Sequence, residues 1–190
     1  MDFDVIFMAG PQGSGKGTQG KRLAAKLGFF SWDTGAELRA IAAQDTELGR
    51  EVAGIINGGV FLSDEILNKI MAERLPLIPE GKGMIFDGVP RRMGQAEFLL
   101  GFLKSKPRKG MVTIYIDLPR EESVRRLLLR ATTEGRVDDT PEAIDKRLKF
   151  FDEVITPVME VLKKETNYIV IDGRPTMDEV EKSINAALGI

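Results

Sequence analysis

Cysteine and histidine are both absent from this chain of 190 residues. Without cysteine there can be no disulfides, no zinc–thiolate sites and no thiol nucleophiles. Without histidine, imidazole bases and the triads that depend on them are excluded as well. Any chemistry must therefore rest on lysine, arginine, carboxylates, hydroxyl groups and the backbone.

The sequence also lacks an excess of charge of one sign and any long hydrophobic run. Its 27 basic and 29 acidic residues give a formal net charge of −2, so the basic surface typical of nucleic-acid binding is not expected. No apolar run approaches the roughly 20 residues that span a bilayer. The first residues include Asp2 and Asp4 rather than a cationic signal region. We therefore expect a single-domain cytoplasmic protein that binds neither nucleic acid nor membrane.

The most informative feature that is present is the glycine-rich segment GPQGSGKGT, residues 10–18. It directly follows the apolar run Val5–Ala9. A strand that feeds such a turn and then a helix is typical of a phosphate-binding loop, because backbone N–H groups and the helix N-terminus attract an anion. Lys16 supplies a cation for the outer phosphates. The strict motif has Ser or Thr next, whereas this chain has Gly17 and then Thr18. We predict that the segment binds a nucleoside triphosphate.

Five short apolar runs predict buried parallel strands, and the helical stretches between them favour an α/β fold. The first helix should begin near Lys16 and end before Gly28, while Thr140 and Pro141 should start a later helix that Pro157 ends. The predicted strands are Val5–Ala9, Phe29–Trp32, Met84–Phe86, Val112–Ile116 and Tyr168–Ile171.

About fifty residues separate the second and third predicted strands, which is long for a crossover. Their pattern is helical, and we interpret them as helices inserted at the carboxyl edge of the sheet to bind a substrate. An ordinary helical crossover that only packs is the alternative.

The third predicted strand ends in Asp87, and Arg91 and Gln95 follow soon after. A carboxylate at this place in a phosphate-loop protein holds magnesium, directly or through water. The arginine fork matches a phosphate, and the glutamine amide can read the edge of a base.

Arginines gather around a short polar loop at residues 132–139. Arg126 and Arg130 are four residues apart and so share one helical face, Arg136 lies in the loop, and Arg147 lies in the next helix. Phosphoryl transfer needs positioning and positive charge rather than a histidine, and these arginines can supply both. The alternative is a solvated helix face paired with neighbouring carboxylates.

Together these segments resemble the adenylate kinase family of nucleoside monophosphate kinases, over nearly the whole chain. The resemblance implies an α/β fold of the P-loop NTPase type, a parallel five-stranded sheet flanked by helices. It also implies one kinase domain over residues 1–190, a helical monophosphate-binding insertion at 33–62 and a short lid at 131–139. The matching segments are Gly13–Gln19, Thr34–Gly35 with Leu38–Arg39, Asp87–Arg91 with Gln95, Gly135–Asp139 and Lys146–Leu148.

The family's reaction is reversible phosphoryl transfer from MgATP to AMP, which gives two ADP. The resemblance implies Mg²⁺ held through water by Asp87, no zinc, and a monomer whose partners are ATP, AMP and ADP. The implied catalytic residues are Lys16, Arg91, Arg126, Arg130, Arg136 and Arg147. The implied ATP-binding residues are Gly13, Ser14, Gly15, Lys16, Gly17, Thr18, Arg126, Arg130 and Pro175. The implied AMP-binding residues are Thr34, Gly35, Arg39, Val60, Phe61, Leu62, Gly88, Val89, Pro90, Arg91, Gln95, Arg136 and Arg147.

The chain departs from the family pattern at two places near the acceptor. Ala36 stands where the family has an aspartate that helps with metal-bound water, and Val89 stands where it has a phenylalanine. These departures leave two alternatives open. One is a kinase for UMP, CMP or another monophosphate, and the other is a nucleotide-binding regulator that has lost turnover.

Overall fold

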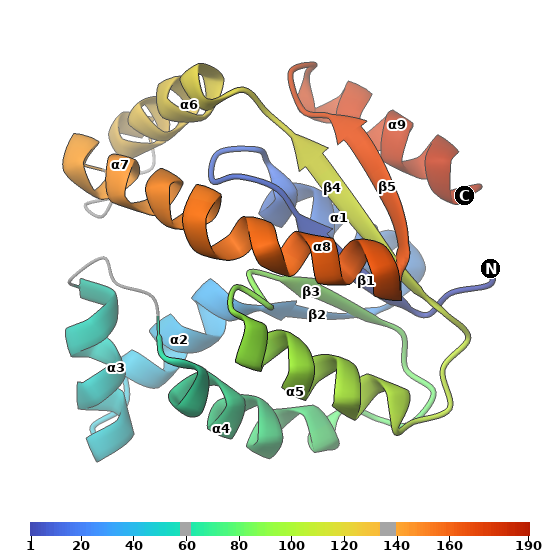
Figure 1. Cartoon of the computed structure of the whole chain (residues 1–190), viewed down its shortest axis with the longest axis horizontal. Coiled ribbons are helices and arrows are strands. Elements are labelled where there is room, and N and C mark those ends of the chain that lie inside the picture. Colours follow the sequence, from blue (N-terminus) through green and yellow to red (C-terminus); the bar gives the residue numbers. More distant parts are fainter. Residues whose placement is uncertain (58–61, 134–139) are drawn as a thin grey trace.

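The computed structural model describes residues 1–57, 62–133 and 140–190. Within these residues, five strands form one parallel sheet in the order β2-β3-β1-β4-β5 (Figure 1). The predicted α/β fold is confirmed, and each strand boundary lies within one residue of its prediction. The strands are β1 (Val5–Ala9), β2 (Phe30–Asp33), β3 (Met84–Asp87), β4 (Met111–Asp117) and β5 (Asn167–Asp172).

Several helices begin or end at residues whose chemistry explains the boundary. The first helix ends at Gly28, whose φ of 66° is in the left-handed region that favours glycine. Thr140 caps the helix that starts at Pro141, as predicted. The helices are α1 (Lys16–Leu27), α2 (Thr34–Ala42), α3 (Glu47–Asn57), α4 (Asp64–Arg74), α5 (Met93–Lys104), α6 (Arg120–Thr133), α7 (Pro141–Phe150), α8 (Thr156–Glu165) and α9 (Met177–Leu188), with a 3₁₀ turn at Leu75–Leu77.

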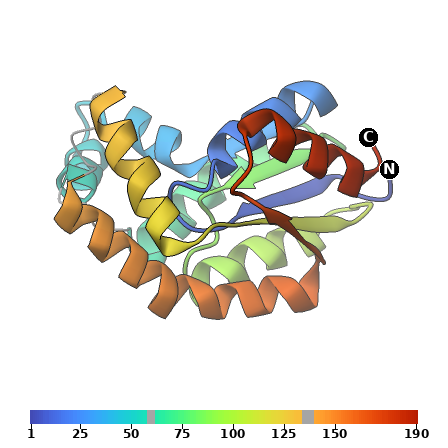
Figure 2. The ribbon, with the colours of Figure 1, turned by 90° about the horizontal axis from the view of Figure 1, so that it is seen from above.

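Helices cover both faces of the sheet, with α1 and α9 on one side and α5 and α8 on the other (Figure 2). Alternate residues of β1 serve the two faces, since Phe7 belongs to the core on the α5 and α8 side. Ile6 and Met8 belong to the core beneath α1 and α9. Because both of its faces are buried, the central strand β1 is apolar throughout, whereas the edge strand β5 has exposed residues such as Asn167 and Val170.

One helix boundary differs from its prediction. The chain stays helical past Pro157, because a π-helical segment, Phe151–Ile155, joins α7 to α8. The backbone N–H of Thr156 donates to the carbonyl of Phe151, five residues earlier. Pro157 then lies in the first turn of α8, where a missing N–H costs little, so it does not end the helical run.

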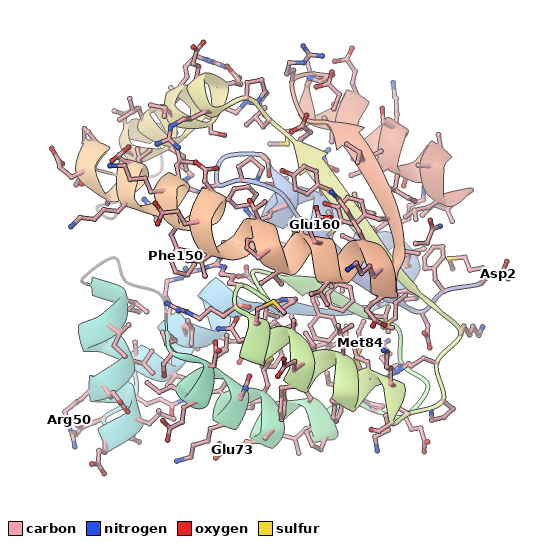
Figure 3. The ribbon with its side chains drawn as sticks, viewed as in Figure 1. Asp2, Arg50, Glu73, Met84, Phe150 and Glu160 are labelled. Carbon is pink, nitrogen blue, oxygen red and sulfur yellow. The ribbon has the colours of Figure 1, made fainter. Side chains whose placement is uncertain are left out.

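The long stretch between β2 and β3 is helical, as predicted, and consists of α2, α3, α4 and the 3₁₀ turn. α2 packs against α3, and α4 packs against α5 beside the sheet. Arg50 and Glu73 lie on the outside of this insertion, whereas Met84 lies in the core (Figure 3). In the described part of the chain, no helix combines the length and the apolar character that crossing a membrane requires.

Candidate functional site

A cleft of about 600 Å³ lies at the carboxyl edge of the sheet, between the loop before α1, the α2 side and the α6 and α7 side. This edge is where open parallel sheets bind ligands. Most of the residues predicted from the sequence meet in this cleft. They are Gly13, Gly15, Lys16, Gly17, Thr18, Thr34, Gly35, Arg39, Leu62, Asp87, Gly88, Arg91, Gln95, Arg126, Arg130 and Arg147.

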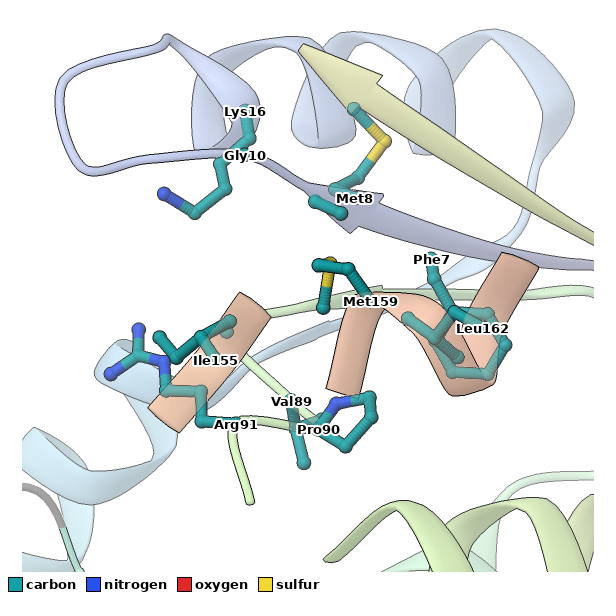
Figure 4. A pocket seen from close by; sticks show the side chains of 12 residues that line it. Phe7, Met8, Gly10, Lys16, Val89, Pro90, Arg91, Ile155, Met159 and Leu162 are labelled. Carbon is teal, nitrogen blue, oxygen red and sulfur yellow. The ribbon is translucent and has the colours of Figure 1, made fainter. Parts of the chain in front are cut away.

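The glycine-rich segment forms the loop between β1 and α1. α1 begins after Gly15, whose φ of 87° suits glycine and which has no side chain to cap the first N–H groups. The Lys16 Nζ donates to the carbonyl oxygen of Pro11 at 3.2 Å. Figure 4 shows Lys16 on one side of a small cavity and Arg91 on the other. The loop therefore offers backbone donors and a cation to an anion in the cleft.

The two charged groups at the centre of the site have displaced pKa values. Burial, and to a smaller extent the positive charges of Arg91, Arg130 and Arg147, lower the pKa of Lys16 from 10.5 to about 8, against the opposing effect of Asp87. Burial likewise raises the pKa of Asp87, against the effect of Lys16. Both charges are unfavourable in the protein alone, so phosphate groups beside Lys16 would stabilise it.

Two carboxylates lie side by side at the ends of β2 and β3, because the strand register pairs Asp33 with Asp87. Asp33 accepts from the N–H of Ala36 at 3.0 Å and pairs with Lys21 at 3.3 Å. The Oδ1 of Asp87 is buried and has no hydrogen-bond partner among the described residues. A Cβ at Gly17 would lie 2.9 Å from the other Asp87 oxygen, which explains the glycine where the strict motif has Ser or Thr. No group of three or more carboxylates that could hold a metal occurs within the described ranges.

Hydrogen bonds orient two polar side chains on the α2 side of the cleft. The indole N–H of Trp32 donates to Thr34 Oγ1 at 3.0 Å, and this hydroxyl donates to the backbone carbonyl of Asp87 at 2.9 Å. The backbone N–H of Arg91 donates to Gln95 Oε1 at 2.8 Å. Thr34 and Gln95 are buried, yet both line the cleft.

The cleft is lined by arginines on the opposite side, from α6 and α7. Arg126 donates to Glu122 at 2.7 Å and to the Arg174 carbonyl at 3.0 Å. Hydrogen bonds from Arg125 and Arg126 lower the pKa of Glu122 to about 2, so this carboxylate is ionised. The predicted shared face of α6 is confirmed, since Arg126 and Arg130 both line the cleft.

A few predicted residues lie elsewhere. Val89 and Pro90 line the small cavity of Figure 4 rather than the large cleft. Ser14 is buried, with no hydrogen-bond partner for its hydroxyl in the described part of the chain, and Pro175 follows Arg174 in the turn before α9. The predicted residues Val60, Phe61 and Arg136 lie outside the described residues. The roles of all of these residues stay predictions.

The sequence reasoning missed some residues that line the cleft. Met177, the first residue of α9, lines it close to Gly15, and Gln19 Nε2 donates to the Met177 carbonyl at 2.7 Å. An apolar residue at the exposed start of a helix is a signal that could have found it. Leu38 also lines the cleft, and its place in the matching segment Leu38–Arg39 could have found it, whereas nothing in the sequence context of Lys21, which lines the cleft too, marks that residue.

Comparison with known proteins adds two findings. The family model described as adenylate kinase matches residues 8–167. A protein of Maricaulis maris called adenylate kinase is 42% identical over 96% of this chain and 97% of its own length. Adenylate kinases of Phocaeicola vulgatus and Thermus thermophilus are 41% and 39% identical, over 97% and 98% of this chain and 96% and 97% of their own lengths.

Proposed function

Because the chain belongs to the adenylate kinase family, we propose that it catalyses reversible phosphoryl transfer from MgATP to AMP, which gives two ADP. The observation that carries this proposal is a single cleft that combines Lys16 with arginines from three other segments, Arg91, Arg130 and Arg147. Phosphoryl transfer spreads negative charge over the equatorial oxygens, and fixed cations stabilise that charge without a proton-transferring base.

The donor ATP binds on the side of the glycine-rich loop in this proposal. The loop from Gly13 to Thr18, with Ser14 beneath it, surrounds the phosphates, and Lys16 follows the transferred group. Arg126 lies against the adenine, because Glu122 and the Arg174 carbonyl hold its guanidinium in place. The main chain near Pro175 borders the same base.

The acceptor AMP binds on the α2 side. The AMP phosphate lies between Arg91 and Arg39, and Gly88 lets it approach, since a Cβ there would lie 3.0 Å from the Arg91 guanidinium. Gln95 reads the base. Thr34, Gly35, Val60, Phe61, Leu62, Val89 and Pro90 complete the proposed AMP site.

The site also fits magnesium bound with the nucleotide. The unpartnered, buried Oδ1 of Asp87 suits a hydrogen bond to metal-bound water. When bound, the ion neutralises charge that develops on the phosphate oxygens. Arg147 from α7 reaches the phosphates of donor and acceptor, and we propose the same for Arg136. The insertion at 33–62, the lid at 131–139, the monomer and the cytoplasmic location stay predictions.

The test is ADP formation from MgATP with AMP, UMP, CMP or GMP as the acceptor. We expect fast ADP formation with AMP and little with the others. A preference for another monophosphate would contradict the proposed acceptor. ATP binding without turnover on any acceptor would favour the regulator instead.

Two neighbouring arginines provide a matched pair of variants. Arg91→Lys should lower kcat/KM for AMP by about 100-fold or more, because lysine cannot hold a phosphate with two parallel hydrogen bonds. Arg92→Lys should change it by less than about threefold, since Arg92 is not among the residues that line the cleft and its guanidinium lies 5.0 Å from the Phe150 ring. Equal effects would contradict the proposed clamp.

A further inference from the structure

The hydrogen bond from Trp32 limits how the hydroxyl of Thr34 can bond to a ligand. The indole N–H can only donate, so it occupies a lone pair of Thr34 Oγ1. The hydroxyl proton points to the backbone carbonyl of Asp87. One lone pair is left, and Thr34 can therefore only accept a hydrogen bond from a ligand in the cleft.

The side chain of Gln95, in contrast, is left as a hydrogen-bond donor toward a ligand. Its Oε1 receives the backbone N–H of Arg91, and only the oxygen of the amide can accept. This bond fixes the orientation of the amide, whose NH₂ group remains to donate. The side chain is 2% exposed, so few other orientations are open to it.

The cleft therefore presents a fixed acceptor on Thr34 and a fixed donor on Gln95. With Thr34 opposite the 6-position of a purine and Gln95 opposite N1, adenine complements this pair through its 6-amino donor and its N1 acceptor. In the same orientation, a 6-oxopurine places its oxygen opposite the Thr34 acceptor and its N1–H opposite the Gln95 donor, so neither hydrogen bond forms.

We propose that Trp32 is a positioning residue that sets the preference for a 6-aminopurine monophosphate over a 6-oxopurine one. This proposal rests on the proposed function, because it concerns the same acceptor site. Trp32 itself is 1% exposed and acts through Thr34. Without the indole N–H, the Thr34 hydroxyl gains a second free lone pair and more rotational freedom, so its proton can turn toward a 6-oxo group.

The test uses the fact that Trp32 is the single tryptophan of the chain. Growth on 3-benzothienyl-alanine replaces the indole N–H by sulfur at this position alone and preserves the size of the ring. Equilibrium binding of AMP and of IMP is then measured by calorimetry, together with kcat/KM for both. The binding arm needs no turnover, so a failure of the proposed reaction can be distinguished from a failure of this inference.

We expect the preference for AMP over IMP to fall by about threefold to tenfold, the contribution of one hydrogen bond. ATP binding should not change. Thr34→Val should lower the preference for AMP over IMP by a similar factor. Incorporating the tryptophan analogue into Thr34→Val should lower this preference no further. An unchanged preference in the analogue protein would overturn the proposal.

Thr113→Val is the control, because it removes a buried hydroxyl that bonds to Thr166 away from the cleft. It should lower stability and leave the AMP preference intact. If it lowered the preference as much as the analogue does, general destabilisation would explain the effect and the proposal would fall.

Discussion

At the scale of single residues, the buried charge of Lys16 lowers the stability of the nucleotide-free protein and favours the binding of phosphate. Its pKa of about 8 means that the protein holds this cation in surroundings that disfavour charge. Lys16→Met removes the cation beside the transferred group and should lower the rate of ADP formation by at least about 100-fold. Because it also removes an unfavourable buried charge, it should raise the melting temperature of the nucleotide-free protein by about 2 °C or more. Turnover close to that of the unaltered protein would show that Lys16 takes no part in the reaction.

The same residue predicts a pH dependence with a defined sign. Between about 8 and 10.5, the unfolded chain carries the Lys16 proton and the folded protein does not. The contribution of Lys16 to the free energy of unfolding therefore increases with pH across this window. Bound phosphates stabilise the protonated form, so ATP binding near pH 8 should take up protons. Calorimetry in two buffers of different ionisation enthalpy measures this uptake, and Lys16→Met should remove it.

The residue scale is also where sequence reasoning meets its limits. Lys16, Asp87 and Arg91 could be predicted because each has a fixed offset from a strand or a glycine-rich turn. The bonds from Trp32 through Thr34 to Asp87 could not, since the last step joins residues 53 positions apart. The hydrogen-bonding state of Thr34 depends on the packing of two strands, which a single sequence does not state.

At the scale of elements, the π-helical segment Phe151–Ile155 sets how α7 is oriented relative to α8. Glu153 is exposed, while Arg147 on α7 lines the cleft. Deleting Glu153 should restore regular α-helix and turn Arg147 by about 100° around the helix axis. We expect kcat/KM for AMP to fall by about tenfold or more, with Glu153→Ala as the matched control that keeps it. Equal kinetics in both variants would show that the π segment does not position Arg147.

The element scale also explains why the fold was predictable. The central strands β1 and β3 are buried on both faces and therefore read as apolar runs, and caps such as Thr140 with Pro141 mark helix starts locally. Pro157 was misinterpreted because a proline is tolerated in the first turn after a π segment. That tolerance depends on the hydrogen bonds of the preceding turn, which the identity of the proline does not reveal.

At the scale of the whole molecule, the sheet places the loop before α1, the end of β3 and the α6 and α7 arginines around one cleft. In the proposed reaction, donor and acceptor meet in this cleft, with cations around the transferred group. In the proposed complex, phosphates offset the unfavourable positive charge of Lys16, and the magnesium ion bound with them offsets the negative charge of Asp87.

The most direct measurement is a single-turnover reaction with ATP labelled in its γ-phosphoryl group, in the presence of Mg²⁺ and AMP. Direct transfer predicts that the label leaves ATP and appears in ADP, with almost none as inorganic phosphate. Label that accumulates as inorganic phosphate, or that stays in ATP while both nucleotides are bound, would contradict phosphoryl transfer between two nucleotides in this cleft.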